Sequence, residues 1–96
     1  MKVRYRALAL ADIESIFAYL NERSPGGARN VLRAIHDAVA EIAVYPQSGL
    51  QTSVADIRVK ILGRYRYKIF YSVGEDTIEI VHVRHAARRP WTGVEE

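Results

Sequence analysis

The sequence of 96 residues contains no cysteine, which excludes a disulfide scaffold, a thiolate zinc site, an iron–sulfur cluster and a cysteine nucleophile. No apolar run approaches the roughly 20 residues of a membrane span, so no membrane partner is expected. A Gly-rich phosphate loop and a Gly-x-Ser-x-Gly elbow are also missing. The residues after Met1 do not resemble a secretory signal. We therefore expect a single cytoplasmic domain, residues 1–96, without a nucleotide cofactor and without the chemistry of a conventional hydrolase.

Positive charge, by contrast, is concentrated in the second half of the chain. The formal net charge is only +3, yet residues 57–91 hold eight Lys or Arg against three acidic residues. Eleven of the 14 basic residues are Arg, whose planar guanidinium pairs well with phosphates and carboxylates. This distribution indicates an anionic partner, either a nucleic acid or an acidic protein segment, although a solvated basic strand face fits it equally well.

The first half of the chain carries a short strand and two helical patterns. Val3 and Tyr5 alternate with basic residues, which predicts a strand. The first apolar stripe is Ile13, Ile16, Phe17 and Leu20, with Asp12 placed near the helix start, where the helix dipole favours acids. The second stripe is Ala28, Val31, Leu32, Ile35, Val39 and Ile42. Ser24-Pro25 predicts the start of the second helix and Tyr45-Pro46 its end, so the two helices form a hairpin.

After a loop at residues 47–56, apolar residues recur with a period of two. Three strands are predicted at 57–61, 65–73 and 77–84, joined by turns at Gly63-Arg64 and Gly74–Asp76. Tyr67 and Tyr71 are expected to face the helical hairpin, and Arg66 and Lys68 to lie on the opposite, open face. In the other two strands Ile57, Val59 and Ile61 alternate with Arg58 and Lys60, and Ile78, Ile80 and His82 alternate with Glu79, Val81 and Val83. The fold class is therefore α+β, in the order β-α-α-β-β-β, with the helical hairpin packed on one face of a small, mainly antiparallel sheet.

The basic residues allow two interpretations, a ribonuclease site or a binding surface without chemistry. Cleavage of RNA by 2′-hydroxyl attack needs a base, an acid and cations around the phosphorane. Lys60, Arg64, Arg84 and His85 could converge to supply them, with His85 as the proton-transfer group. No carboxylate is evidently placed to assist, which favours a binding surface without chemistry. His82 and His85 point to opposite faces of a regular strand, so a shared metal ion is not expected.

The order and spacing of several segments resemble the RelE/ParE superfamily of toxins from bacterial toxin–antitoxin modules, over nearly the whole chain. These segments are residues 3–6, Ala11-Asp12-Ile13, Ala28-Arg29, Tyr45–Gly49, Gly63–Tyr71, Ile78–His85 and Ala87-Arg88. The stretches 63–71 and 78–85 are the most specific. One departure is Ala7-Leu8-Ala9 at the helix entry, where Ser-Pro is common in the family.

The resemblance implies one of two activities. RelE-like members cleave messenger RNA in the ribosomal A site, whereas ParE-like members are implied to poison DNA gyrase. RelE-like toxins usually have a Tyr or His-Tyr near the C-terminus, but the tail after Arg84 has His85 and Trp91 and no Tyr. The long hairpin and the Arg-Tyr-Arg-Tyr strand look more like ParE. The resemblance therefore favours a gyrase inhibitor that binds its target, with a ribosome-dependent mRNA endoribonuclease or a non-toxic binding module as alternatives.

The resemblance also implies partners and contact residues. For gyrase, the target-binding residues are expected to be Arg64, Arg84, Arg88, Arg89 and Trp91. A ParD-like or other acidic antitoxin is expected to bind Arg66, Lys68 and Arg84 in a toxin–antitoxin hetero-oligomer. If the ribonuclease interpretation holds, the ribosome and mRNA are the partners, and Lys60, Arg64, Arg84 and His85 carry the chemistry. No cofactor or metal is implied.

Overall fold

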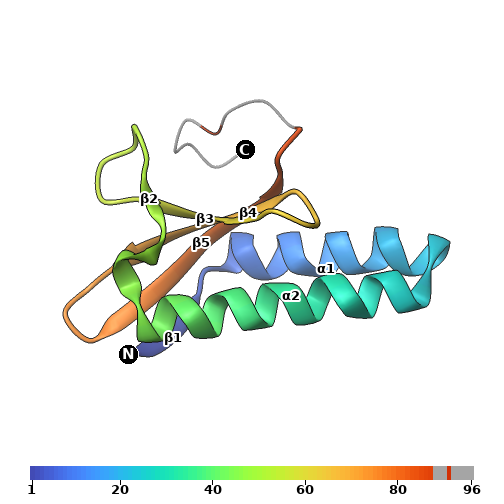
Figure 1. The fold of residues 1–96 in the computed structure, drawn as a ribbon, viewed down its shortest axis with the longest axis horizontal. Helices are drawn as coiled ribbons and strands as arrows, with labels where there is room; N and C mark the ends of the chain where they lie inside the picture. The colour runs from blue at the N-terminus through green and yellow to red at the C-terminus, as the bar shows by residue number, and fades with distance from the viewer. Residues whose placement is uncertain (88–90, 92–96) are drawn as a thin grey trace.

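A computed structural model describes residues 1–87 and 91. Figure 1 shows the elements in chain order. They are β1 (Lys2–Tyr5), α1 (Ala7–Arg23), α2 (Pro25–Val44), the 3-10 helix η1 (Pro46–Ser48), β2 (Leu50–Gln51), β3 (Arg58–Leu62), β4 (Tyr67–Val73) and β5 (Thr77–His85). The predicted α+β order is confirmed. Within the loop predicted at 47–56, the structure adds a two-residue strand, β2, which pairs with β3 through Leu50–Val59 and Gln51–Arg58.

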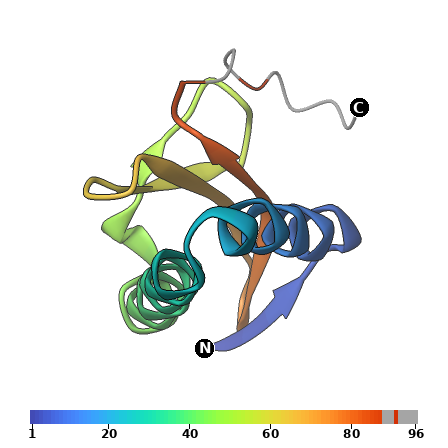
Figure 2. The same cartoon turned by 90° about the vertical axis from the view of Figure 1, so that its right-hand side faces the viewer.

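The sheet is mixed, with strand order β1-β5-β4-β3-β2. β1 runs parallel to its neighbour β5, and every other pair is antiparallel, as the tight turns between β3, β4 and β5 require. The α1–α2 hairpin covers one face of this sheet (Figures 1 and 2). We call the opposite face the open face. β5 is therefore an interior strand, as its aliphatic centre predicted.

The hairpin forms where the sequence predicted it. The Ser24 side chain caps α2 by accepting a hydrogen bond from the Gly27 N–H at 3.1 Å, and Pro25 occupies the first helical position. α2 ends at Val44, two residues before Pro46. The α2 stripe is buried except for Leu32, which is 39% exposed and was wrongly assigned to the core. In α1, Ile13, Ile16 and Leu20 pack against the core group, while Phe17 is only half-buried.

The core lies between the hairpin and the sheet. Ile69, Tyr71, Ile78 and Ile80 are fully buried there, and Tyr67 is buried beside them, as predicted. For β3, the alternation alone did not show which face is buried, and the register with β4 shows it. Register pairs Lys60 with Ile69 and Ile61 with Lys68, so Lys60 faces the hairpin and Ile61 lies on the open face, 49% exposed. A single alternation cannot show which of its two faces is buried when both contain residues with long aliphatic stems.

Two departures from regular strand geometry also change which residues share a face. The register shifts between Phe70 and Tyr71, so Val81 is an extra residue on β5. As a result Val83 joins the core, while His82, predicted to face the same way as Ile80, lies on the open face. Arg66 was predicted to share that face with Lys68, but it belongs to the turn at 63–66 and has a φ of 61°.

Candidate functional site on the open face

Two rows of side chains cross the open face, each contributed by β3, β4 and β5. The first row is Ile61, Lys68 and Arg84, and the second is Val59, Phe70 and His82. Directly opposed side chains in antiparallel pairs have Cβ atoms about 4.5–5.5 Å apart. The first row therefore places two cations side by side, and the second row places an apolar and aromatic surface next to them.

Lys68 and Arg84 of the first row and Val59 and Phe70 of the second lie in a hollow of about 260 Å³. Leu50, Gln51, Thr52 and Ser53 line it from the β2 segment, and Val59, Lys68, Phe70, Arg84, His85, Ala86 and Trp91 complete it. Lys68 and Arg84 give the hollow a positive character, while Leu50, Phe70 and Trp91 give it apolar walls. Such a surface suits a partner that carries both acidic and apolar or aromatic groups.

Three aromatic rings are in contact at one side of the hollow. The Trp91 indole lies 4.9 Å from the Phe70 ring and 5.3 Å from the His82 ring, measured between centroids. Phe70 and His82 are stacked at 6.2 Å with an interplanar angle of 28°. Separations of 4.5–7 Å are the favourable range for aromatic pairs. Trp91, predicted as a target contact, is therefore packed on the sheet.

Asp12 of α1 contacts His82 at the outer edge of β5. The His82 Nδ1 lies 2.5 Å from the Asp12 Oδ2, and the same oxygen accepts a hydrogen bond from the Val83 N–H at 2.9 Å. β1 ends at Tyr5, opposite Ile80, so within the described part of the chain no strand pairs with the outer edge of β5 beyond Ile80. Asp12 occupies this edge and satisfies a backbone donor that a longer β1 would have used.

The role predicted for Asp12 was therefore wrong. α1 begins at Ala7, six residues after Met1, and its first turn holds no acidic residue. Asp12 lies in the second turn, where the helix dipole adds little. Sequence reasoning missed the Asp12–His82 pair because the two residues are 70 positions apart and the bulge at Val81 reverses the facing of His82.

Lys60 and Arg64, two of the four residues expected to converge, lie away from the hollow. The Lys60 Nζ lies 3.1 Å from the Glu41 Oε2 of α2, on the hairpin face. Arg64 is in the turn at 63–66, with its guanidinium 5.6 Å from the centre of the Tyr65 ring. Arg84 and His85, the other two, do line the hollow. The structure thus does not bring the expected set of four together.

His85 is already engaged within the chain. Its Nδ1 accepts a hydrogen bond from the Ala87 N–H at 3.1 Å, and its ring meets that of Tyr67 edge-on at 5.2 Å. The accepting Nδ1 leaves the ring proton of a neutral imidazole on Nε2. Burial raises the pKa of the Tyr67 phenol, and the neighbouring Tyr19 raises it further. Tyr67 is therefore neutral at physiological pH and contributes packing to this site.

The remaining predicted contacts divide in the same way. Among the expected antitoxin contacts, Lys68 and Arg84 are adjacent across β4 and β5, whereas Arg66 lies in the turn. Arg88 and Arg89 lie outside the described residues. Neither described helix combines the length and apolar character that a membrane crossing needs.

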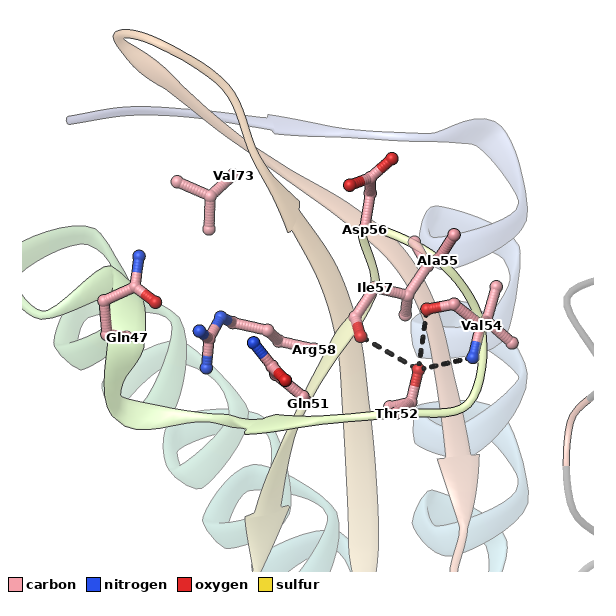
Figure 3. Close-up of a pocket in the computed structure, with 9 residues that line it drawn as sticks. All are labelled: Gln47, Gln51, Thr52, Val54, Ala55, Asp56, Ile57, Arg58 and Val73. Atoms are coloured by element: carbon pink, nitrogen blue, oxygen red, sulfur yellow. Dashed lines mark hydrogen bonds between the residues drawn. The ribbon is translucent and has the colours of Figure 1, made fainter.

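A second hollow, of about 390 Å³, lies under the β2–β3 loop (Figure 3). Its Arg58 points into the hollow, and the Arg58 Nη1 donates a hydrogen bond to the Gly49 carbonyl at 2.7 Å. The Thr52 hydroxyl is within hydrogen-bond distance of the Val54 N–H and the Ile57 carbonyl, at 3.1 and 2.8 Å. These contacts brace the loop that forms one wall of the open-face hollow.

Comparison with known proteins identifies the class that this fold and face define. The model of the family described as ParE toxin of type II toxin–antitoxin system, parDE, matches residues 3–90. The chain belongs to this ParE toxin family of the RelE/ParE superfamily, and it is a toxin of the type II toxin–antitoxin class.

Two relatives and one solved structure illustrate the range of the similarity. The chain is 33% identical over 85 residues to the putative toxin Y4kP of Sinorhizobium fredii, covering 88% of each. It is 34% identical over 80 residues to toxin RelE2 of Caulobacter vibrioides, covering 83% of this chain and 89% of the relative. A chain of the chromosomal ParDE system from P. aeruginosa has a TM-score of 0.78 at 19% identity, over 88% of this chain and 95% of that one. The last comparison confirms the predicted fold.

Proposed function

We propose that this toxin acts by binding DNA gyrase through its open face and that a cognate antitoxin neutralises it. The proposal is supported by the contacts that His85, Lys60 and Arg64 make, because these residues would have to converge at the open-face hollow for catalysis. His85 accepts a backbone hydrogen bond, while Lys60 and Arg64 lie outside the hollow. What remains is a pair of cations beside a cluster of aromatic rings, and two members of this set, Arg84 and Trp91, are of the types enriched in binding hot spots.

Membership of the ParE toxin family supports the same target. The proposed target contacts are Arg84 and Trp91, together with Arg88 and Arg89 of the tail and Arg64 at the adjoining turn. Binding of this kind uses no proton transfer, so the proposal requires no catalytic residue. It requires a surface that holds gyrase in one state.

An acidic, ParD-like antitoxin is the proposed second partner. One solved structure with a similar fold is that of a ParDE system. Lys68 and Arg84 would meet acidic side chains of the antitoxin, with Arg66 contributing from the turn. Such contacts are screened by salt, so the affinity of the complex should fall as ionic strength rises. Charge reversal of Lys68 and Arg84 should weaken the complex, and an unchanged affinity would contradict this part of the proposal.

The target is tested with purified toxin freed of antitoxin. DNA supercoiling and cleavage by gyrase are measured alongside cleavage of mRNA on translating ribosomes. His85→Gln should retain inhibition of gyrase, because no proton transfer is needed. Trp91→Ala and the paired Arg88→Glu/Arg89→Glu variant should each lose it, by about 30-fold or more if Trp91 is a hot spot. Arg23→Glu, at the far tip of the hairpin, is the matched charge-reversal control.

The ribonuclease alternative predicts the opposite pattern. In that case wild-type toxin cuts mRNA on ribosomes, leaves gyrase unaffected, and loses its activity in the His85→Gln variant. Circular dichroism on every variant separates a lost activity from a lost fold. Absence of both activities would favour the non-toxic binding module.

A further inference from the structure

Asp12 of α1 contacts β5, the strand that carries Arg84 and His82 of the open face, through the His82 ring and the Val83 N–H. Its side chain is 17% exposed and that of His82 is 11% exposed, so the contact between them is largely shielded from water. Hydrogen bonds to an ionised carboxylate are stronger and more directional than neutral ones, and shielding strengthens them further. The short Nδ1–Oδ2 bond therefore fixes the plane of the His82 ring.

The His82 ring in turn forms part of the seat of Trp91. Phe70 and His82 are nearly parallel to each other, and the indole meets them at interplanar angles of 61° and 58°. If the His82 ring rotated about its side-chain bonds, the indole would lose its contact with that ring and keep only its contact with Phe70. The plane that Asp12 imposes on His82 is thus the plane that Trp91 requires.

We propose that Asp12 is a positioning residue for Trp91: by orienting His82, it seats the indole on the open face. The functional consequence rests on the proposed function, in which Trp91 contacts the target. A residue of the helical hairpin would then control target binding on the opposite side of the sheet. The same oxygen of Asp12 also accepts a hydrogen bond from the Val83 N–H, so Asp12 could instead act only by stabilising the edge of β5. The experiment must distinguish this structural role from the positioning of Trp91.

Trp91 is the only tryptophan of the chain, so its fluorescence reports on this seat alone. We would measure acrylamide quenching and the emission maximum of the full-length toxin for Asp12→Ala, Asp12→Asn, His82→Phe and the double variant Asp12→Ala/His82→Phe. His82→Phe retains a ring for Trp91 but cannot bond Asp12. The matched control is Asp37→Ala, because Asp37 and His36 form an exposed acid–histidine pair on α2, with their atoms 3.6 Å apart.

Asp12→Ala should raise the quenching constant and shift the emission to longer wavelength. Loss of one aromatic contact should move the equilibrium between seated and unseated Trp91 by about 2- to 12-fold. Asp12→Asn, whose amide oxygen can still accept both hydrogen bonds, should retain most of the seating. Asp37→Ala should match wild type. In the His82→Phe background, Asp12→Ala should produce no further change, because its effect passes through His82.

Two results would overturn the proposal in variants that circular dichroism shows to be folded. One is unchanged Trp91 quenching in Asp12→Ala. The other is an equal shift on adding Asp12→Ala to His82→Phe, which would assign the effect to the β5 edge. If Asp12→Ala does not fold, the proposal is tested by comparing His82→Phe with wild type. Unchanged Trp91 quenching in His82→Phe would refute positioning through the Asp12–His82 bond. Because fluorescence is read without gyrase, displaced Trp91 with intact gyrase inhibition would instead refute the target role of Trp91 in the proposed function.

Discussion

Replacing Tyr71 with phenylalanine should release the segment that joins the hairpin to the sheet. Tyr71 is fully buried, and its hydroxyl makes two hydrogen bonds to this segment. It donates to the Pro46 carbonyl at 2.7 Å and accepts from the Gly49 N–H at 2.9 Å. One oxygen atom of β4 thus holds η1 and the start of β2. Removing it leaves the ring, and therefore most of the apolar packing, in place.

The magnitude follows from what the two partners lose. Gly49 is buried, so its N–H would be left without an acceptor, and an unsatisfied buried donor costs about 1–3 kcal/mol. The Pro46 carbonyl is half-buried and has a second lone pair, so water can compensate for part of its loss. We therefore expect Tyr71→Phe to lower the free energy of unfolding by about 1–3 kcal/mol in total. For a domain of this size, each kcal/mol corresponds to a fall in Tm of about 4–8 °C.

Urea unfolding followed by circular dichroism would measure this loss. Tyr45→Phe is the matched control, because Tyr45 precedes Pro46 directly but is 65% exposed, and a surface change should stay within about 0.5 kcal/mol. Gly49→Ala probes the same contact from the other side, since its Cβ would lie only 2.7 Å from the Tyr71 Cε1. It should also destabilise, by about 1–3 kcal/mol. If Tyr71→Phe matched Tyr45→Phe, the reasoning that the hydroxyl anchors this segment would be refuted.

Two further predictions concern the core and the phenols. Ile35→Ala should lower the free energy of unfolding by about 2–5 kcal/mol, because Ile35 lies in the core and is 3% exposed. Phe17→Ala should lower the free energy of unfolding by less, because Phe17 is only half-buried. Equal decreases in urea unfolding would contradict this ranking. Burial raises the pKa of Tyr5 and Tyr67 above 10.0, so the folded state holds protons that the unfolded chain releases first. The contribution of these two phenols to stability is fully present below pH 10 and is lost as pH rises through their folded-state pKa values. The urea concentration at the midpoint of unfolding, measured from pH 8 to 11.5, should therefore fall above pH 10.

The elements with strong local signals could be predicted from the sequence. Ser24-Pro25 and Tyr45-Pro46 limit the second helix because each acts on its own backbone, and the structure places the helix between them. The turns around Gly63 and Gly74 likewise determine the meander, although the first extends to residue 66. β2 carried no such signal. Two residues are too short for an alternation, and Leu50 and Gln51 are extended because β3 is beside them.

The facing of residues depends on tertiary contacts that local patterns do not contain. Ile61 and Lys60 could each have faced the hairpin; in the structure Lys60 shares that face with the buried Leu62 and pairs with Glu41 on α2. On β5, the extra residue Val81 reverses the alternation after Ile80. Because both features lie on strands that form the open face, the candidate site was less predictable than the fold. Arg84 and Trp91 were named from the sequence, but the seat that joins Trp91 to Asp12 was not.

The arrangement of the two cations gives a last argument about the open face. Lys68 and Arg84 are directly opposed on neighbouring strands, and like charges in that position destabilise a sheet. The core gains nothing from them, because Ile69 and Val83 fill the corresponding positions on the hairpin face. The acidic antitoxin proposed above would place negative charge beside both side chains, at the edge of an aromatic surface. The two cations and the neighbouring aromatic rings would thus be used together by the binding proposed above, which is the reason for testing Lys68 and Arg84 by paired charge reversal rather than one at a time.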